Sequence, residues 1–403
     1  MKIKNKKMLA IVPDFYPSET GFSVAFQNLY KCLIDEEKLS YIHVLTTNIN
    51  NKEKIKNFKY KNRITAEYFS KLIRGEKKLY KINSFLLKIL YKISSYFIIK
   101  KIKKIIKEKD IDFIFIESVF LGWLSHEIEK TLKIPVITRF HGTGPEYGVR
   151  TKEDSYLRIS IDEVFKNKYI AMTTHFYIDF FEKYFNNYER FYEKKFFIIP
   201  NTLKVEKEIK LNKFEKTLKF IQLGRMDKSG FHQKGFIDTI EAFLYLEKIL
   251  DKEILKKISF ISIGTGEKEE EYRKILKKLK YINIEHYSSL SNEKVQEKLE
   301  ESNICLIPSR TEGMSMFATE AMSLGKVFIF TYKNGMKDMI LDQYNGLGMH
   351  AYNYLELAEK IRYFLENPEK IEEFSKNSSI LFEKEFNNKI VANKFLVMLD
   401  FLE

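Results

Sequence analysis

The sequence predicts two α/β domains, each built on a parallel, doubly wound β-sheet. The chain has 403 residues, which is the usual length of two domains rather than one. Hydrophobic residues make up 44% of the chain, which is enough to fill two cores. Short apolar runs alternate with helix-length segments in both halves, and this alternation is typical of parallel sheets covered by helices.

The first half contains apolar runs that we predict to be the strands of one sheet. A helix is predicted over residues 22–34, where apolar side chains recur at helical spacing directly after Gly21. The polar, lysine-rich residues 48–62 are interpreted as an excursion from the sheet. We place the first domain at residues 1–200 and expect its strands at 8–12, 41–46, 112–116, 135–139, 169–173 and 196–199.

The second half repeats the alternation of strand and helix. We place the second domain at residues 201–385 and expect residues 386–403 to form a helix that packs back on the first domain. The strands are expected at 218–223, 260–263, 282–286, 304–307 and 327–331. The helices between them are expected at 234–250, 268–280, 292–301 and 316–324.

Composition narrows the choice of partners. The net charge of +14 comes mostly from lysine and favours acidic partners such as nucleotide phosphates or anionic lipid. We expect no nucleic-acid partner, because there is no helix-turn-helix, zinc ligand set or stacking motif and the lysines are spread over many helical faces. Cys32 and Cys305 are the only cysteines, which fits a reducing compartment.

No segment has the pattern of an export signal or of a membrane span. The apolar core of residues 1–13 is too short for a signal peptide. No apolar run reaches the roughly 18 residues that a transmembrane helix needs. We therefore expect a cytoplasmic protein, or one attached peripherally to the inner face of the membrane.

The segment from Lys81 to Lys109 is the least typical part of the chain. Its Leu, Ile and Phe residues recur every three or four positions with lysines between them, which predicts one basic amphipathic helix or a pair. The stripe has two explanations, packing on the protein's own sheet or binding to an anionic membrane surface. We favour packing, although both explanations require the same stripe.

Residues 303–330 form the stretch on which the functional interpretation depends. An apolar strand at 304–307 is followed by a polar loop and by a helix that Gly325 ends. Doubly wound sheets bind ligands at the carboxyl ends of their strands. Glu312 and Glu320 lie in this unit and are the main candidates for ligand binding.

Each of these glutamates also has a purely structural explanation. Ser309 to Glu312 has the spacing of a helix capping box, although Gly313 follows at once and the apolar periodicity begins later. Glu320 could be an exposed helix carboxylate, but its apolar neighbours predict burial. Because a buried carboxylate without partners costs several kcal/mol, a hydroxyl-rich ligand is the more attractive explanation.

A candidate anion site follows the predicted strand at 218–223. Gly224 permits a sharp turn, and Arg225 and Lys234 flank a polar loop that leads into a helix. Two cations beside a helix N-terminus suit a diphosphate, and the alternative is that both are solvated surface cations. After the next strand, Gly264 begins a turn whose backbone can approach a flat ligand, but the third glycine of a dinucleotide fingerprint is missing.

His141 is the one histidine with a suggestive setting. It follows a predicted strand and precedes a glycine-containing loop, so it contacts either a ligand or its own loop. His126 lacks the second histidine of a zinc-protease helix. Asp110 and Asp112 have the spacing of a metal-binding pair, but Asp112 leads directly into a strand, and we expect it to be solvated or to act as a cap. The sequence therefore predicts no metal site.

Taken together, these motifs resemble one family. From about residue 196 to 350 the chain is similar to the donor-binding domain of retaining glycosyltransferases of the GT-B fold, glycosyltransferase family 4 (glycosyl transferases group 1). Glu312 and Glu320 match the E-x7-E signature of that family, and in the first half the resemblance rests on Gly21 and His141. The matching stretches occur in the family's order: IIPNT (198–202), FIQLGRMDKSGFHQKGF (220–236), ISIGTGE (261–267), PSRTEGMSMFATEAMSLGKVFI (308–329) and NGMKDMILDQYNGLGM (334–349).

The resemblance implies two Rossmann-like domains that face a central cleft, the first for the acceptor and the second for the nucleotide-sugar donor. It assigns catalytic roles to four residues: Arg225 and Lys234 would bind the donor diphosphate, Glu312 the donor sugar, and His141 would face that sugar from the other domain. Glu320 would accept the ribose hydroxyls. The remaining donor contacts are assigned to Gly21, Gly224, Gly264, Gly313, Met314, Ser315 and Met316.

Two positions depart from the family pattern. Thr20-Gly21 stands where the family usually has Gly-Gly, and the nine positions that separate Arg225 from Lys234 are more than is common. These departures concern how closely the diphosphate can approach the backbone and whether Lys234 reaches it.

The predicted function is the retaining transfer of a hexose from a nucleoside diphosphate sugar, with UDP as the expected nucleotide. The acceptor is expected to be a hydroxyl of a glycan or lipid-linked molecule in cell-envelope polysaccharide synthesis, and no metal or cofactor is expected. Two alternatives are a nucleotide-sugar epimerase on the same fold and a non-catalytic accessory subunit. The first needs a catalytic carboxylate set that we cannot place. The presence of Arg225, Lys234, Glu312 and Glu320 argues against the second.

Overall fold

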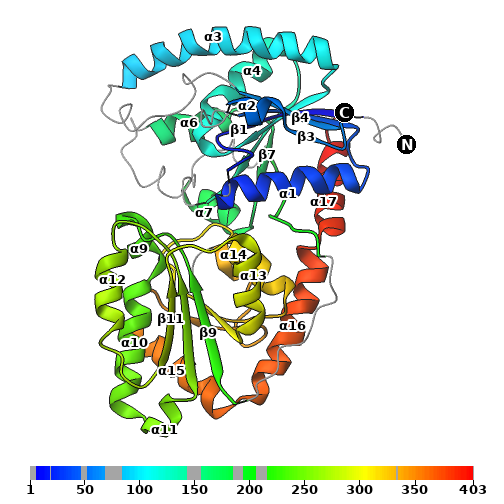
Figure 1. Cartoon of the computed structure of the whole chain (residues 1–403). Helices are drawn as coiled ribbons and strands as arrows, with labels where there is room; N and C mark the ends of the chain where they lie inside the picture. Colours follow the sequence, from blue (N-terminus) through cyan, green and yellow to red (C-terminus); the bar gives the residue numbers. More distant parts are fainter. Residues whose placement is uncertain are drawn as a thin grey trace. The chain divides into compact units, whose positions relative to one another are not determined.

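The protein is described by a computed structural model that covers two compact units (Figure 1). The first unit comprises Met1–Lys204 with Phe386–Glu403, and the second comprises Val205–Glu385. The first unit therefore ends its main segment at Lys204, four positions after residue 200, where we predicted the first domain to end. The structure describes residues 6–18, 20–46, 52–68, 84–142, 156–184, 194–205, 216–332 and 335–402.

The first unit is built on one sheet with the strand order β3-β4-β2-β1-β5-β6-β7-β8. All neighbouring strands are parallel except β3 and β4. The order reverses its direction between β1 and β5. The strands are β1 (Lys7–Val12), β2 (Tyr41–Thr46), β3 (Lys59–Tyr60), β4 (Ile64–Tyr68), β5 (Phe113–Glu117), β6 (Val136–Phe140), β7 (Tyr169–Met172) and β8 (Lys195–Ile198).

Helices cover both faces of this sheet, because successive strand side chains point in opposite directions. In β1, Leu9 and Ile11 join a core that contains side chains of α3, α4, α6 and α7. Met8 and Ala10 join a second core with α1 and α17. The helical elements are α1 (Gly21–Asp35), α2 (Lys52–Lys56), α3 (Ser84–Lys109), the 3-10 helix η4 (Val119–Leu124), α4 (Ser125–Leu132), α6 (Tyr156–Val164), α7 (Phe176–Tyr184) and α17 (Asn388–Asp400).

The second unit contains a wholly parallel sheet with the order β11-β10-β9-β12-β13-β14. Its strands are β9 (Leu218–Leu223), β10 (Ile258–Ile263), β11 (Asn283–Tyr287), β12 (Ile304–Ile307), β13 (Val327–Thr331) and β14 (Gly346–Met349). Its helical elements are α9 (Lys228–Lys234), α10 (Phe236–Ile249), α11 (Lys252–Leu255), α12 (Glu269–Leu276), α13 (Asn292–Glu301), α14 (Met316–Ser323), the 3-10 helix η5 (Gly335–Asp338), α15 (Tyr354–Glu366) and α16 (Glu369–Glu385).

Three parts of the chain differ from the prediction. The excursion expected at 48–62 contains α2 and β3, and the unpredicted β4 follows it and pairs with β2. β14 was missed because two of its four residues are glycines, which lower strand propensity. The helix expected at 234–250 is α10, which begins at Phe236 because Gly235 at φ +70° separates it from α9, a preceding helix that was not predicted.

None of the described helices combines the length and hydropathy needed to cross a bilayer.

Candidate functional site

The strongest candidate site lies in the second unit, at the carboxyl ends of β9 and β12. These strands are neighbours in the sheet, but the chain continues from β9 to one side and from β12 to the other. The loops that follow the two strands therefore diverge. Ligands of open α/β sheets bind in the crevice that forms at such a reversal.

The turn after β9 brings Lys234 across Gly224. A Cβ atom on Gly224 would lie 2.7 Å from Cγ of Lys234, so the absence of a side chain leaves room for the lysine stem. The amide of Gln222, in β9, donates to the carbonyl oxygen of Lys234 at 2.9 Å. Lys234 is the last residue of α9, and these contacts direct it back over the strand end.

Lys234 and Glu312 form an ion pair at the centre of this site. The distance from Lys234 Nζ to Glu312 Oε2 is 2.7 Å, and the two side chains are 20% and 12% exposed. The capping-box explanation of Glu312 is wrong, because α14 begins at Met316 and is capped by Ser315, whose hydroxyl accepts from the N–H of Ala318. Lys234 therefore reaches the loop after β12 despite the long gap from Arg225.

Hydrogen bonds and an ion pair hold this loop against the end of α9 and against α10. The N–H of Arg310 donates to the carbonyl oxygen of Gln233 at 2.8 Å, and the Gln233 amide donates to the carbonyl oxygen of Thr311 at 2.9 Å. The Arg310 guanidinium also pairs with Asp238 of α10 at 2.6 Å and 2.7 Å, with both side chains about one-tenth exposed or less. This pair was not predicted from the sequence. The feature that could have indicated it is Asp238, a charged residue at a buried position of α10.

A third segment, which begins at Gly335, packs against the loop that carries Glu312. The N–H of Gly335 donates to the carbonyl oxygen of Glu312 at 2.8 Å. A Cβ atom on Gly335 would lie 1.6 Å from the carbonyl oxygen of Gly313, so only glycine fits. Gly313, Met314 and Ser315 are buried as they lead into α14. Their backbone approaches the positive end of the helix dipole, which suits an anion.

Glu320 lies one turn into α14 and is half-buried. Within the described part of the chain, its carboxylate has no hydrogen-bond or ion-pair partner, and burial raises its pKa to about 7. The predicted burial of this side chain is thus confirmed in part, and the carboxylate is free to accept bonds from a ligand.

Arg225 is not drawn into the Lys234–Glu312 pair. Its guanidinium pairs with Asp227 at 2.8 Å and its side chain is 65% exposed. Asp227 caps α9 by accepting from the N–H groups of Ser229 and Gly230. The Gly230 N–H bond and the nearby Arg225 hold the pKa of Asp227 below its ordinary value.

Gly264 links the loop after β10 to the loop after β9. A Cβ atom on Gly264 would lie 2.2 Å from the carbonyl oxygen of Gly224. The N–H of Met226 donates to the carbonyl oxygen of Thr265, and the N–H of Lys268 donates back to the carbonyl oxygen of Met226. The observed reason for glycine at 264 is therefore close packing of two loops.

In the first unit, His141 belongs to a buried polar cluster. Its Nε2 lies 2.6 Å from Oε2 of Glu117. The guanidinium of Arg139 donates one hydrogen bond to each oxygen of the same carboxylate, at 2.8 Å and 2.9 Å. Tyr30 donates to the same carboxylate. Burial and the charge of Arg139 lower the pKa of His141 to about 4, so the ring is neutral near pH 7. Because the carboxylate accepts, Nε2 carries the proton.

Gly21 begins α1 at the loop after β1. Thr20 is the helix cap and accepts from the N–H of Ser23, while its own hydroxyl donates to Asp14 at 2.8 Å. In the part of the chain that the structure describes, no further residue lies within 4 Å of the position that a Cβ on Gly21 would take. Among the described residues the backbone at Gly21 is thus uncovered on that side, and the residue before it has a capping role.

No metal-binding cluster is found among the described residues, as judged by groups of three or more His, Cys, Asp or Glu side chains. Asp112 accepts from the N–H of Lys7 at 2.6 Å, and Asp110 pairs with the Lys7 ammonium. The expectation that Asp112 is a cap or a solvated group is confirmed, because its exposed carboxylate accepts from a backbone N–H.

Residues 204–380 match the family model of glycosyl transferases group 1. Over 88% of this chain and 87% of its own length, an uncharacterized glycosyltransferase of Methanocaldococcus jannaschii is 27% identical. Sucrose-phosphate synthase from Thermosynechococcus elongatus superposes with a TM-score of 0.73 at 14% identity, covering 98% of this chain and 99% of that one. Anabaena HepE in complex with UDP gives a TM-score of 0.69 at 13% identity with the same coverage. The predicted GT-B fold is confirmed, and the matches support a glycosyltransferase.

Proposed function

We propose that the chain is a retaining glycosyltransferase that moves a hexose from a nucleoside diphosphate sugar to a hydroxyl acceptor. The observation that carries the proposal is the Lys234–Glu312 ion pair beside the N-terminus of α14, at the reversal of the second sheet. It lies within the segment that matches glycosyl transferases group 1. The bound UDP of HepE, a structure with the same fold, supports UDP as the nucleotide to test first.

The diphosphate is proposed to bind Lys234 and Arg225. A lysine ammonium has three donors, of which Glu312 occupies one, so the others remain for phosphate oxygens. Arg225 is exposed and bound only to Asp227 among the described residues, so it can turn toward a bound anion. Fixed positive charge at the departing diphosphate stabilises the charge that develops as the glycosidic bond breaks.

Glu312 and Glu320 are proposed to hold the sugar and the ribose, which are opposite ends of one donor molecule. Glu312, held in place by Lys234, accepts bonds from donor sugar hydroxyls, and the N–H groups from Gly313 to Met316 contact sugar and phosphate. The half-buried carboxylate of Glu320 accepts from the two ribose hydroxyls, which replace the water that burial removes. The backbone at Gly224 and Gly264 borders the same pocket in this proposal.

In the first unit, Gly21 and His141 are proposed to meet the donor. A diphosphate is proposed to approach the backbone at Gly21, where no other described residue covers the Cβ position. Since Nε2 of His141 is bound to Glu117, its Nδ1 is the ring atom left for a sugar hydroxyl. The first unit is proposed to bind the acceptor, a glycan or lipid-linked hydroxyl of envelope polysaccharide synthesis, and the reaction is proposed to need neither metal nor cofactor.

The test is a panel of UDP-hexoses, and of the corresponding GDP sugars, incubated with the purified chain and hydroxyl acceptors. Release of nucleotide together with a glycoside of unchanged anomeric configuration, seen by NMR, is expected, with equal rates in EDTA. An inverted product would overturn retention. Epimerised nucleotide sugar formed without acceptor would identify an epimerase, and the absence of nucleotide binding by calorimetry would identify a non-catalytic subunit.

A further inference from the structure

Helix α3 has two apolar faces, of which packing explains only one. Ile98, Ile102 and Ile105 are buried in the core of the first unit, with Ile128 of α4 in the same cluster. The amphipathic stripe seen in the sequence is therefore explained by packing on the protein's own fold. This packing leaves the opposite face of α3 to be explained.

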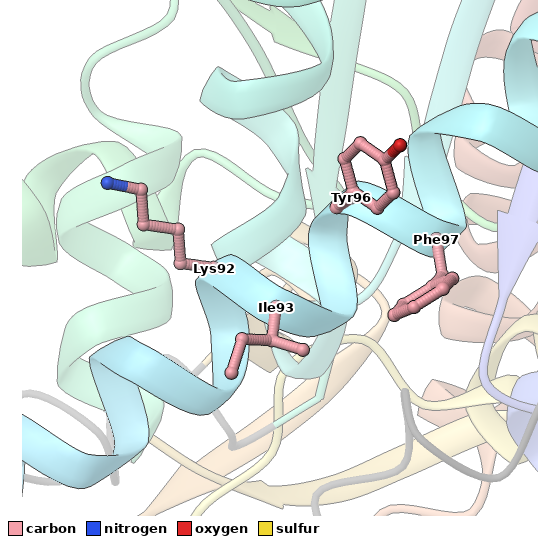
Figure 2. A pocket seen from close by; sticks show the side chains of 4 residues that line it. All are labelled: Lys92, Ile93, Tyr96 and Phe97. Atoms are coloured by element: carbon pink, nitrogen blue, oxygen red, sulfur yellow. The ribbon is translucent and has the colours of Figure 1, made fainter.

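The opposite face presents three large hydrophobic side chains to solvent. Ile93, Tyr96 and Phe97 are 55%, 66% and 61% exposed, and with Lys92 they line a pocket of about 350 Å³ (Figure 2). The rings of Tyr96 and Phe97 meet edge to face at 5.5 Å. Single exposed apolar residues are ordinary on protein surfaces, but three within five positions of one helix form a patch.

A row of cations continues this apolar patch along the same face. Lys100, Lys103, Lys104 and Lys107 are all exposed. At 100° per residue, they and the three apolar residues fall within an arc of about 120°. Glu108 is the only acidic residue of α3, and it pairs with Lys104 at 3.6 Å. Since Glu108 pairs with one of the four lysines, the face keeps a net positive charge beside its apolar patch.

We propose that this face of α3 docks on an anionic lipid bilayer. Ile93, Tyr96 and Phe97 would enter the boundary between headgroups and acyl chains, where amphipathic aromatic side chains are favoured. The four lysines would lie over anionic headgroups. A pairing of two copies through the whole face is disfavoured, because antiparallel helices would set the apolar patch of one copy against the lysines of the other, and parallel helices would set the two lysine rows together. A surface-lying helix also agrees with the absence of a spanning helix among the described residues.

The proposal is tested by co-sedimentation of the full chain with vesicles of phosphatidylcholine alone or of phosphatidylcholine with phosphatidylglycerol. We expect binding to the anionic vesicles that weakens with salt, and little binding to the neutral ones. Replacing the four lysines by glutamine is expected to lower the partition coefficient on anionic vesicles on the order of 100-fold. Substituting serine at Ile93, Tyr96 and Phe97 is expected to lower it roughly tenfold or more.

Matched variants in the second unit provide the controls. Ile249→Ser removes a side chain that is 46% exposed on α10. Glutamine at Lys274, Lys277, Lys278 and Lys280 removes the same charge from another exposed set. Both control variants are expected to bind as the parent does. Thermal unfolding of every variant is compared with the parent, since surface substitutions are expected to leave the fold intact.

Four results would overturn the proposal. The first is no binding of the parent to anionic vesicles, and the second is equal binding to neutral and anionic vesicles. The third is a dimer in light scattering that the apolar substitutions in α3 dissociate, because the face would then join two copies of the chain. Loss of binding in the control variants equal to the loss in the α3 variants would show general basic attraction and would also overturn it.

Discussion

The ammonium of Lys234 lies 2.7 Å from the carboxylate of Glu312, which is 78 positions later in the sequence. The contact joins the end of α9 to the loop after β12. It exists because β9 and β12 are adjacent at the reversal of the sheet and because Gly224 leaves room for the lysine stem. A cation and a hydrogen-bond acceptor are thereby held side by side beside a helix N-terminus.

Replacing Glu312 by glutamine keeps the size of the side chain but removes its charge. We expect kcat for glycosyl transfer to fall on the order of 100-fold, as when a preorganised electrostatic contact to the reacting centre is removed. Glu241→Gln, on the exposed surface of α10, is the matched control and should be neutral. Undiminished turnover of the Glu312→Gln protein would contradict the assignment of this residue.

Lys234→Gln removes the proposed diphosphate cation. UDP affinity, measured by calorimetry, is expected to fall roughly tenfold to 100-fold, because charge-assisted bonds to phosphate are among the strong ones. Lys228→Gln, at the exposed beginning of the same helix, is the control. Equal losses in the two variants would mean that only overall charge matters.

Gly224→Ala should displace Lys234 without unfolding the protein. The new Cβ would lie 2.7 Å from Cγ of Lys234, near the base of that side chain, so the stem has to move. We expect a roughly tenfold rise in KM for the donor, since small misplacements of positioning groups are costly. Thermal stability should change little, and an unchanged KM would show that the lysine tolerates the shift.

Glu320 gives a pH dependence with a definite sign. Its pKa of about 7 lies above the ordinary value of 4.5 because the side chain is buried, so the folded protein binds a proton that the unfolded chain releases between these values. Burial of Glu320 therefore destabilises the fold increasingly as pH rises from about 4.5 through 7. Glu320→Gln should be on the order of 2 kcal/mol more stable at pH 8, after discounting for partial exposure, and nearly equal at pH 4.

Ionisation of Glu320 should strengthen nucleotide binding, although it destabilises the fold. If the ionised carboxylate accepts from the ribose hydroxyls, UDP affinity of the parent rises as pH increases through about 7. The Glu320→Gln protein should bind more weakly and with a flatter profile in calorimetry. Parallel profiles for the two proteins would place the titration elsewhere.

The Arg310–Asp238 pair is expected to position the loop that carries Glu312. Asp238→Ala leaves the guanidinium buried without its partner and should lower the free energy of unfolding by about 3 kcal/mol. Combining Arg310→Met with Asp238→Leu should restore much of that stability, because both charges are removed. If the double variant regains stability but not donor KM, the pair positions the loop; recovery of both would indicate a purely structural role.

Most of the fold could be predicted because strand and helix patterns are local. Residues 304–307 and 327–331 matched β12 and β13, and alternating buried side chains in β1 explain why helices cover both faces. β14 was not predicted, because its glycines have low strand propensity. They are required by close contacts with Phe328 and Tyr332, which only the folded sheet creates.

The sequence by itself determined the two series of strands and helices and the presence of two carboxylates around the start of α14. Only the tertiary structure decided what these carboxylates contact. Glu312 pairs with Lys234 and not with a helix cap, whereas Glu320 keeps an unpaired carboxylate among the described residues. The reason is that periodicity and propensity act within a few residues, whereas strand order brings together side chains that are distant in the chain.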